Sequence, residues 1–246
     1  METHLMKVSK DTLDVLKNFS GIQCNLLIEP GSTIKTISEQ KNVLAECKVA
    51  DTFDTEIAIY DLNKFIGVIS LFKDPDFQFN QKSVCIKEAD PKAATFVEYR
   101  YAEKRTLKYP DRDLNMPDVA IEFTLKKDDL EALLKASAVM GVGNFILKGD
   151  GETAELLVCD LKNVTSNTYS VGVKVVNHSA VGEYIICLNA DTLKFIPDDY
   201  NVQATKQVCR FESVGRAKNG LDLVYHVATE STSSKLNVGE AVTEGA

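Results

Sequence analysis

Residues 56–72 combine two periodicities of apolar side chains. The first five residues alternate and include β-branched side chains, a pattern typical of a strand. Asp61 then suits the cap of a helix, because its carboxylate can accept a backbone N–H that the first turn leaves unpaired. From Asp61 to Phe72, at about 100° per residue, apolar side chains gather on one face and small or polar ones on the other. The stretch predicts a buried strand followed by an amphipathic helix whose outer face carries Lys64.

A similar order of elements occurs twice along the chain. Residues 9–19 have helical spacing between Ser9 as a cap and Gly21 as a stop, residues 127–133 echo them, and residues 190–196 predict a short fourth helix. Each half of the chain has the order helix, three strands, strand, helix, three strands. This internal repeat predicts two similar domains. The remaining predicted strands are residues 22–29, 33–38, 43–49, 76–80, 83–89, 95–101, 119–125, 145–148, 154–160, 169–176, 183–188, 201–207, 208–213 and 221–228.

The regular pattern is interrupted in the middle of the chain and at its end. The middle stretch is charged, is bracketed by prolines and has no period, which favours an interdomain connector. Its Leu107 and Tyr109 are unusually apolar for a linker, so we expect it to lie on a protein surface. The polar end predicts a disordered tail. The expected divisions are an N-terminal domain at 6–101, the connector at 102–118, a C-terminal domain at 119–230 and the tail at 231–246.

Composition restricts the class of protein. The 246 residues are 44% hydrophobic and 26% charged, as in globular proteins, and no apolar run approaches the roughly 20 residues that span a membrane. The first five residues lack the features of a signal peptide, and Met6 also suits a natural start. Six single cysteines without a Cys-x-x-Cys motif favour buried free thiols in a reducing cytoplasm. The net charge of −8 argues on average against nucleic acid, but it does not describe how charge is distributed.

Motifs for catalysis or metal binding are missing from the sequence. His4, His178 and His226 are not near a second ligand at metal spacing, and no serine-elbow, zinc-protease or phosphate-loop pattern occurs. Gly141 and Gly143 resemble half of a dinucleotide loop, but they follow a predicted helix instead of opening one. We therefore predict a protein that is not an enzyme and that holds no cofactor or metal.

The outer faces of the predicted helices remain as candidate functional surfaces. Lysines occur on each face, and we expect most acids to concentrate in the strands, connector and tail. Against this, Asp14 lies between Lys10 and Lys17, and Asp128 and Glu131 flank Lys135. An ordinary solvated face also carries lysines. Gly67 and Ser70 beside Lys64 leave room for a bulky partner, which favours a binding surface. The lysines are Lys10, Lys17, Lys64, Lys127, Lys135 and Lys194.

Several segments carry a resemblance to a known family. The closest match is centred on Ala-Ile-Tyr-Asp-Leu-Asn at residues 58–63, and it resembles the DNA polymerase sliding clamps of T-even-like bacteriophages. A weaker, collinear similarity extends this resemblance over roughly the whole chain. The segments that carry it are residues 6–12, 16–19, 57–71, 129–135, 189–197 and 206–230.

The resemblance implies an α+β DNA clamp fold, in which two similar domains each pack two helices on antiparallel β-sheets. Three subunits would form a ring with helices around duplex DNA. The ring would slide because it contacts phosphates without reading bases, and a basic lining would be compatible with an acidic exterior. The implied partners are double-stranded DNA, the DNA polymerase, an ATP-driven clamp loader and late-transcription factors. The resemblance implies no interaction with a membrane. The implied location is the cytoplasm of the infected bacterial host.

The resemblance also assigns residues by position. Lys10, Lys17, Lys135 and Lys194 match basic residues on the family's inner helices, whereas Ala138 stands where the family has a further arginine. Lys64 replaces a small residue, and it and Lys127 complete the predicted DNA-binding set. The family's pocket for partner peptides would correspond to Leu44, Leu107, Tyr109, Val224 and Val227. The alternative function is a β-rich structural or scaffold protein without a role on DNA.

Overall fold

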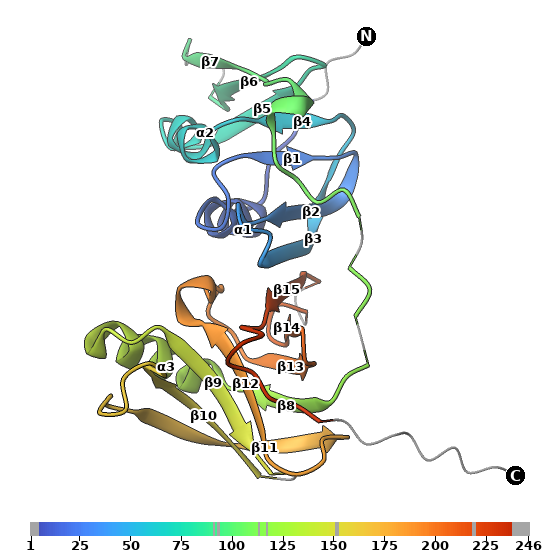
Figure 1. Ribbon diagram of the computed structural model, residues 1–246. Helices are drawn as coiled ribbons and strands as arrows, with labels where there is room; N and C mark the ends of the chain where they lie inside the picture. The colour runs from blue at the N-terminus through green and yellow to red at the C-terminus, as the bar shows by residue number, and fades with distance from the viewer. Residues whose placement is uncertain are drawn as a thin grey trace, which may run out of the picture. The chain divides into compact units, whose positions relative to one another are not determined.

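The chain forms two compact units (Figure 1). Unit 1 comprises Met1–Asp113 and Arg216–Leu223, and unit 2 comprises Leu114–Gly215 and Val224–Ala246. The computed structural model describes residues 5–90, 92, 94–112, 114–116, 118–150, 153–217 and 220–237. Residues 1–4, which precede the expected N-terminal domain, and residues 238–246 of the expected tail at 231–246 lie outside the described residues.

The described residues of unit 1 form two α-helices that begin where the sequence predicts. Helix α1 spans Lys10–Ser20, and Ser9 Oγ accepts a hydrogen bond from the N–H of Thr12 at 3.2 Å. Helix α2 spans Leu62–Ile69, and Asp61 Oδ1 accepts one from the N–H of Lys64 at 2.9 Å. These side chains satisfy N–H groups that a first helical turn leaves unpaired, which confirms both predicted caps.

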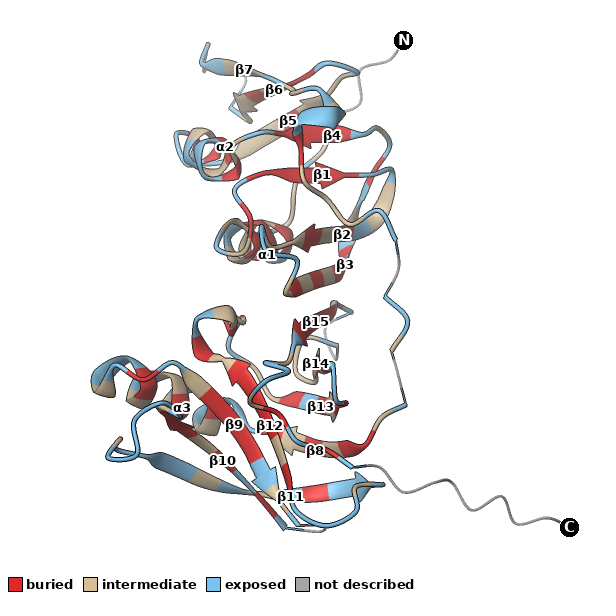
Figure 2. Cartoon of the chain, viewed as in Figure 1, coloured by how far each residue is buried: buried red, intermediate tan, exposed pale blue. Residues whose placement is uncertain are grey.

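The strands of unit 1 lie on one side of its two helices, as Figure 1 shows. Strand β1 pairs with β4, β2 with β3, and β6 lies between β5 and β7, all antiparallel. Helix α1 contacts α2 and β3, and β1 and β4 are buried along their whole length (Figure 2). The bounds are β1 (Leu26–Ile28), β2 (Gly31–Ile37), β3 (Val43–Phe53), β4 (Ile57–Ile59), β5 (Pro75–Phe79), β6 (Ser83–Glu88) and β7 (Phe96–Arg100).

Unit 2 packs one α-helix against an antiparallel sheet. Helix α3 spans Lys127–Met140, contacts β10 and β11, and ends at Gly141, whose φ of 66° is a left-handed conformation that glycine adopts without strain. The strands of this unit follow the order β12-β9-β10-β11-β8-β13-β14-β15. Their bounds are β8 (Ile121–Leu125), β9 (Asn144–Gly149), β10 (Thr153–Cys159), β11 (Tyr169–His178), β12 (Tyr184–Asn189), β13 (Tyr200–Ala204), β14 (Val208–Ser213) and β15 (Asp222–Ala228).

The predicted fourth helix at residues 190–196 is wrong. The segment forms a 3₁₀ turn at Ala190–Thr192, where the Asn189 side chain accepts from the N–H of Asp191. A proline follows at position 197, and a residue before proline is disfavoured in the α conformation. The Phe195 ring then stacks on the Tyr225 ring with centroids 4.4 Å apart. The described part of unit 2 therefore has one α-helix where the repeat predicted two.

The expected tail is ordered over its first residues. The N–H of Cys187 donates to Ser234 Oγ at 3.0 Å, Lys235 forms a β-bridge with Ile185, and Leu236 is buried. Lys235 thus pairs with the edge of β12, where the N–H and carbonyl of Ile185 find partners. The expectation of disorder from residue 231 is wrong for this stretch.

Burial confirms the predicted free thiols at most cysteines. Cys47, Cys159, Cys187 and Cys209 are buried, and desolvation raises the pKa of the Cys47 thiol to about 12. Cys24 is exposed instead, so the expectation of burial is wrong there. Among the described residues, no three potential ligands gather at metal-binding distance, and no helix is long and apolar enough to cross a membrane.

Candidate nucleic-acid interface and connector pocket

The helices of unit 1 present three of the predicted lysines to solvent. Lys10 and Lys17 are exposed on α1, and their spacing of seven residues places them on one face. Lys64 is exposed near the start of α2, which packs beside α1. Lys17 Nζ lies 3.7 Å from an Asp14 carboxylate oxygen, and Lys64 Nζ lies 3.1 Å from one of Asp61. Nearby carboxylates therefore neutralise two of these three charges in part.

Helix α3 presents the equivalent lysines of unit 2. Lys127 Nζ lies 3.9 Å from a Glu131 carboxylate oxygen. Lys135 lies two turns further along the same face, is exposed and forms no ion pair with another described residue. Lys194 is also exposed, but it follows the 3₁₀ turn and does not lie on an α-helix.

Acidic side chains lie beside the lysines on the helix faces. Asp14 and Glu131, which the sequence already places near these lysines, form ion pairs, and Asp61 adds a third. Such exposed pairs contribute little to stability, yet they reduce the local positive potential. Lys10 and Lys135 have no ion pair within the described residues, so they are the strongest candidate phosphate contacts.

Helix α2 has an open outer surface around Lys64. Asn63, Gly67 and Ser70 are exposed, and a Cβ placed on Gly67 would meet no atom within 4 Å. Tyr60, immediately before the cap, is 64% exposed, and no motif in the sequence singled it out as a surface residue. This surface therefore leaves space for a bulky ligand.

The connector begins by packing on unit 1, as its apolar residues predicted. It forms a 3₁₀ turn at Lys104–Thr106, after which Leu107 is buried against Leu27 and Ala58, with Tyr109 against the same cluster. Ion pairs and hydrogen bonds add to this contact. The N–H of Lys108 donates to Asn25 Oδ1 at 2.9 Å. Two residues of the expected connector, at positions 113 and 117, lie outside the described residues.

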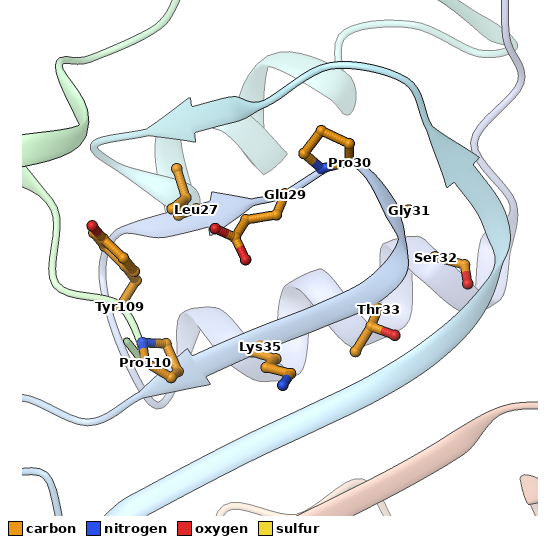
Figure 3. Close-up of a pocket in the computed structure, with 9 residues that line it drawn as sticks. All are labelled: Leu27, Glu29, Pro30, Gly31, Ser32, Thr33, Lys35, Tyr109 and Pro110. Atoms are coloured by element: carbon orange, nitrogen blue, oxygen red, sulfur yellow. The ribbon is translucent and has the colours of Figure 1, made fainter. Parts of the chain in front are cut away.

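A pocket of about 150 Å³ lies between β1, β2 and the connector (Figure 3). Of the predicted peptide-pocket residues, Tyr109 lines it and Leu107 belongs to the adjoining apolar cluster. Leu44 is half-buried in β3, whereas Val224 and Val227 are buried in β15 and offer little surface to a ligand. Sequence reasoning missed most of the lining, because separate strands supply it. The nine lining residues are Leu27, Glu29, Pro30, Gly31, Ser32, Thr33, Lys35, Tyr109 and Pro110.

Charged residues frame this pocket. Lys104 Nζ lies 2.7 Å from a Glu56 carboxylate oxygen, 3.5 Å from one of Glu29 and 5.2 Å from the centroid of the Tyr109 ring. The hydrogen bond to Glu56 is the main cause that raises the pKa of Lys104. Glu29 thus shares this lysine with Glu56, whose carboxylate lies closer to the ammonium.

Comparison with known proteins finds sequence relatives of this chain among phage proteins. No family model matches it. Over 232 residues, covering 92% of this chain and all of the relative, it is 29% identical to the sliding clamp of Vibrio phage KVP40. It is 26% identical to the sliding clamp of Escherichia phage RB69 over 221 residues, covering 85% of this chain and 92% of the relative. The chain is a homologue of phage sliding clamps. The clamp of phage T4 is 33% identical over 132 residues, covering 54% of this chain and 57% of the relative.

Solved structures show that this sliding-clamp homologue has the DNA clamp fold. The proliferating cell nuclear antigen (PCNA) of Thermococcus kodakaraensis superposes with a TM-score of 0.66 at 11% identity, covering 92% of this chain and 98% of the other. The PCNA of A. fulgidus bound to the C-terminal region of FEN-1 gives 0.66 at 10% identity, covering 92% and 97%. The α+β clamp fold expected from the sequence is confirmed, apart from the fourth helix.

Proposed function

We propose that this chain is a sliding clamp that encircles duplex DNA as a homotrimeric ring and tethers the replicative DNA polymerase in the infected host cell. The observation that carries the proposal is the similarity to the KVP40 sliding clamp along that relative's full length, together with the DNA clamp fold. The proposed role is topological and needs no catalytic group. An ATP-driven clamp loader would open and close the ring, and the same ring would serve late transcription as a mobile activator.

Two strand edges support assembly into a ring. In unit 1, β7 lies at the edge of its three-stranded sheet. In unit 2, Tyr169–Lys174 of β11 pair with β10, whereas the pairing of β11 with β8 begins at Val175. Unpaired strand edges are templates for pairing with another chain, and a contact between two unlike edges generates a ring when its rotation closes. We propose that β7 of one subunit pairs with β11 of the next.

The proposed DNA contacts are the exposed lysines of the helices and the nearby turn. Each would contribute a contact to phosphate without reading a base, which suits a ring that must move along DNA. Neutralisation of Lys17, Lys64 and Lys127 by neighbouring acids supports weak contact, because fewer counterions are released on binding. The full proposed set is Lys10, Lys17, Lys64, Lys127, Lys135 and Lys194.

We further propose that partner proteins dock peptide segments beside the connector. The structural neighbour from A. fulgidus binds the C-terminal region of FEN-1, which supports peptide docking as a property of the fold. The proposed residues are Leu44, Leu107, Tyr109, Val224 and Val227, with Tyr109 and the adjoining pocket as the accessible part.

Primer extension tests the proposed function. On a long singly primed circular template, the chain together with its cognate polymerase, loader and ATP is expected to lengthen the products made in a single binding event. A closed ring prevents polymerase dissociation, so a competitor template added after initiation should not shorten these products. Products of equal length with and without the chain would contradict the clamp function and would favour the alternative of a scaffold without a role on DNA.

A further inference from the structure

The pocket beside the connector has the size of a single side chain. Its volume of about 150 Å³ is below the roughly 300–1,000 Å³ typical of small-molecule sites. Leu27, Tyr109 and Pro110 form an apolar, partly aromatic wall on the side of β1 and the connector (Figure 3). The small volume suits one side chain of a protein partner better than a free ligand. The apolar wall suits a side chain that is flat or unbranched.

The remaining lining contains one carboxylate, two hydroxyl groups and one ammonium. Figure 3 shows the Glu29 carboxylate in the space between β1 and β2, and this side chain is 66% exposed. Ser32 and Thr33 add hydroxyl groups that form no side-chain hydrogen bond with the described residues. The Lys35 ammonium, which would repel a cation, points toward β3 in Figure 3 and lies 3.6 Å from a Glu46 carboxylate oxygen. The Glu29 carboxylate, with hydroxyl oxygens nearby, therefore favours a guest that carries several hydrogen-bond donors.

The chain itself places one cation near Glu29 and Tyr109, although Glu56 is its nearest carboxylate. Lys104 places its ammonium 5.2 Å from the Tyr109 ring centroid and 3.5 Å from Glu29. An ammonium near an aromatic ring is attracted to the ring's negative face. Lys104 does not line the pocket, so it leaves the pocket side of Tyr109 and Glu29 open to a second cation.

We propose that this pocket binds an arginine side chain of a partner protein, with the guanidinium paired to Glu29 and the aliphatic stem along Tyr109 and Pro110. The inference rests on the proposed function, in which partner segments dock beside the connector. Arginine suits the site better than lysine, because its planar group stacks on an aromatic ring and offers five donors to the carboxylate and hydroxyl oxygens. An aliphatic guest would leave those oxygens unpaired.

Fluorescence of an introduced tryptophan tests the inference. The chain has no tryptophan, so a Tyr109→Trp variant reports on the pocket alone. The probes are capped Ser-Gly-Xaa-Gly-Ser peptides, with arginine, lysine, norleucine or glutamate at Xaa. The arginine peptide is expected to change the fluorescence saturably and to bind more tightly than the other three. Saturation-transfer NMR with the unaltered chain should give the same order, which controls for the tryptophan.

The Glu29→Gln variant identifies the partner of the guanidinium. It should weaken binding of the arginine peptide about two- to fivefold, as expected for a partly exposed charge pair, and leave binding of the norleucine peptide unchanged. Glu155→Gln is the matched control, because Glu155 is an exposed strand carboxylate in unit 2. Equal binding of the arginine and norleucine peptides, no saturable binding, or insensitivity to Glu29→Gln would overturn the inference. Primer extension with the unaltered chain reports separately on the clamp function.

Discussion

Replacing Glu98 with proline is expected to convert a particle of about 82 kDa, three copies of a 27.2 kDa chain, into a monomer. The N–H of Tyr101 donates to the carbonyl of Lys82, so alternate residues of β7 direct their backbone toward β6 and Glu98 directs its own toward the free edge. Proline removes that N–H and blocks pairing with another strand. Light scattering at micromolar concentration measures the change.

The control for this variant is Glu98→Ala, which removes the same side chain but keeps the N–H. It should remain a trimer at micromolar concentration. At dilutions where both variants are monomeric, they should unfold at similar denaturant concentrations, because the ladder between β6 and β7 does not use the N–H of Glu98. A trimeric Glu98→Pro variant would exclude β7 as an interface strand.

Reversing the charge of Lys10 and Lys135 together is expected to reduce processive synthesis on the order of tenfold. Each lysine to glutamate change replaces a phosphate contact with repulsion, and a trimer carries three copies of each. These two lysines have no ion pair within the described residues, so their charge is the most available on the helices. Product lengths in primer extension measure the effect, which should lessen as salt screens the charges.

Lys48→Glu combined with Lys148→Glu is the matched control. It has the same net charge as the Lys10 and Lys135 double variant, −12 instead of −8, and it also changes one lysine in each unit. Lys48 lies between the buried Cys47 and Val49 of β3, and Lys148 pairs across the sheet with the exposed Glu155. Both side chains are therefore on strand faces turned away from the helices, and processivity should be retained. An equal loss in the two double variants would indicate a general effect of charge instead of a DNA-facing surface.

Local chemistry made much of the fold predictable. Ser9 and Asp61 cap the helices that follow them, since their short side chains reach N–H groups within the same turn. The alternating burial of β3 and the glycine after α3 likewise depend on neighbouring residues alone. Such elements depend on interactions between residues close in sequence, so the sequence pattern is enough to predict them.

The segment after β12 shows where that reasoning fails. Its apolar spacing suits one helical turn, but Phe195 packs with three aromatic rings from β13, β14 and β15, and the N–H of Ile196 donates to the Tyr225 hydroxyl. Contacts with residues distant in sequence outweighed a short helical pattern that ends at a proline.

The candidate sites were predictable in unequal parts. The lysines could be listed from helical spacing, but which of them have ion pairs depends on side-chain geometry that spacing does not determine. Tyr109 was assigned to the pocket by position through the family resemblance, and its apolar character in a charged stretch indicated that the connector lies on a protein surface. Glu29 and Ser32 were missed, because they lie around a turn without a motif and meet Tyr109 only when the connector folds onto β1 and β2.

Retention on circular DNA tests the encircling ring most directly. The labelled chain, loaded onto nicked circular DNA with its cognate loader and ATP, should co-elute with the DNA in gel filtration. Cutting the circle once with a restriction enzyme should release it, because a ring held by topology slides off a free end. A chain that stays bound after linearisation, or that never remains with the circle, would contradict the proposal that it encircles DNA.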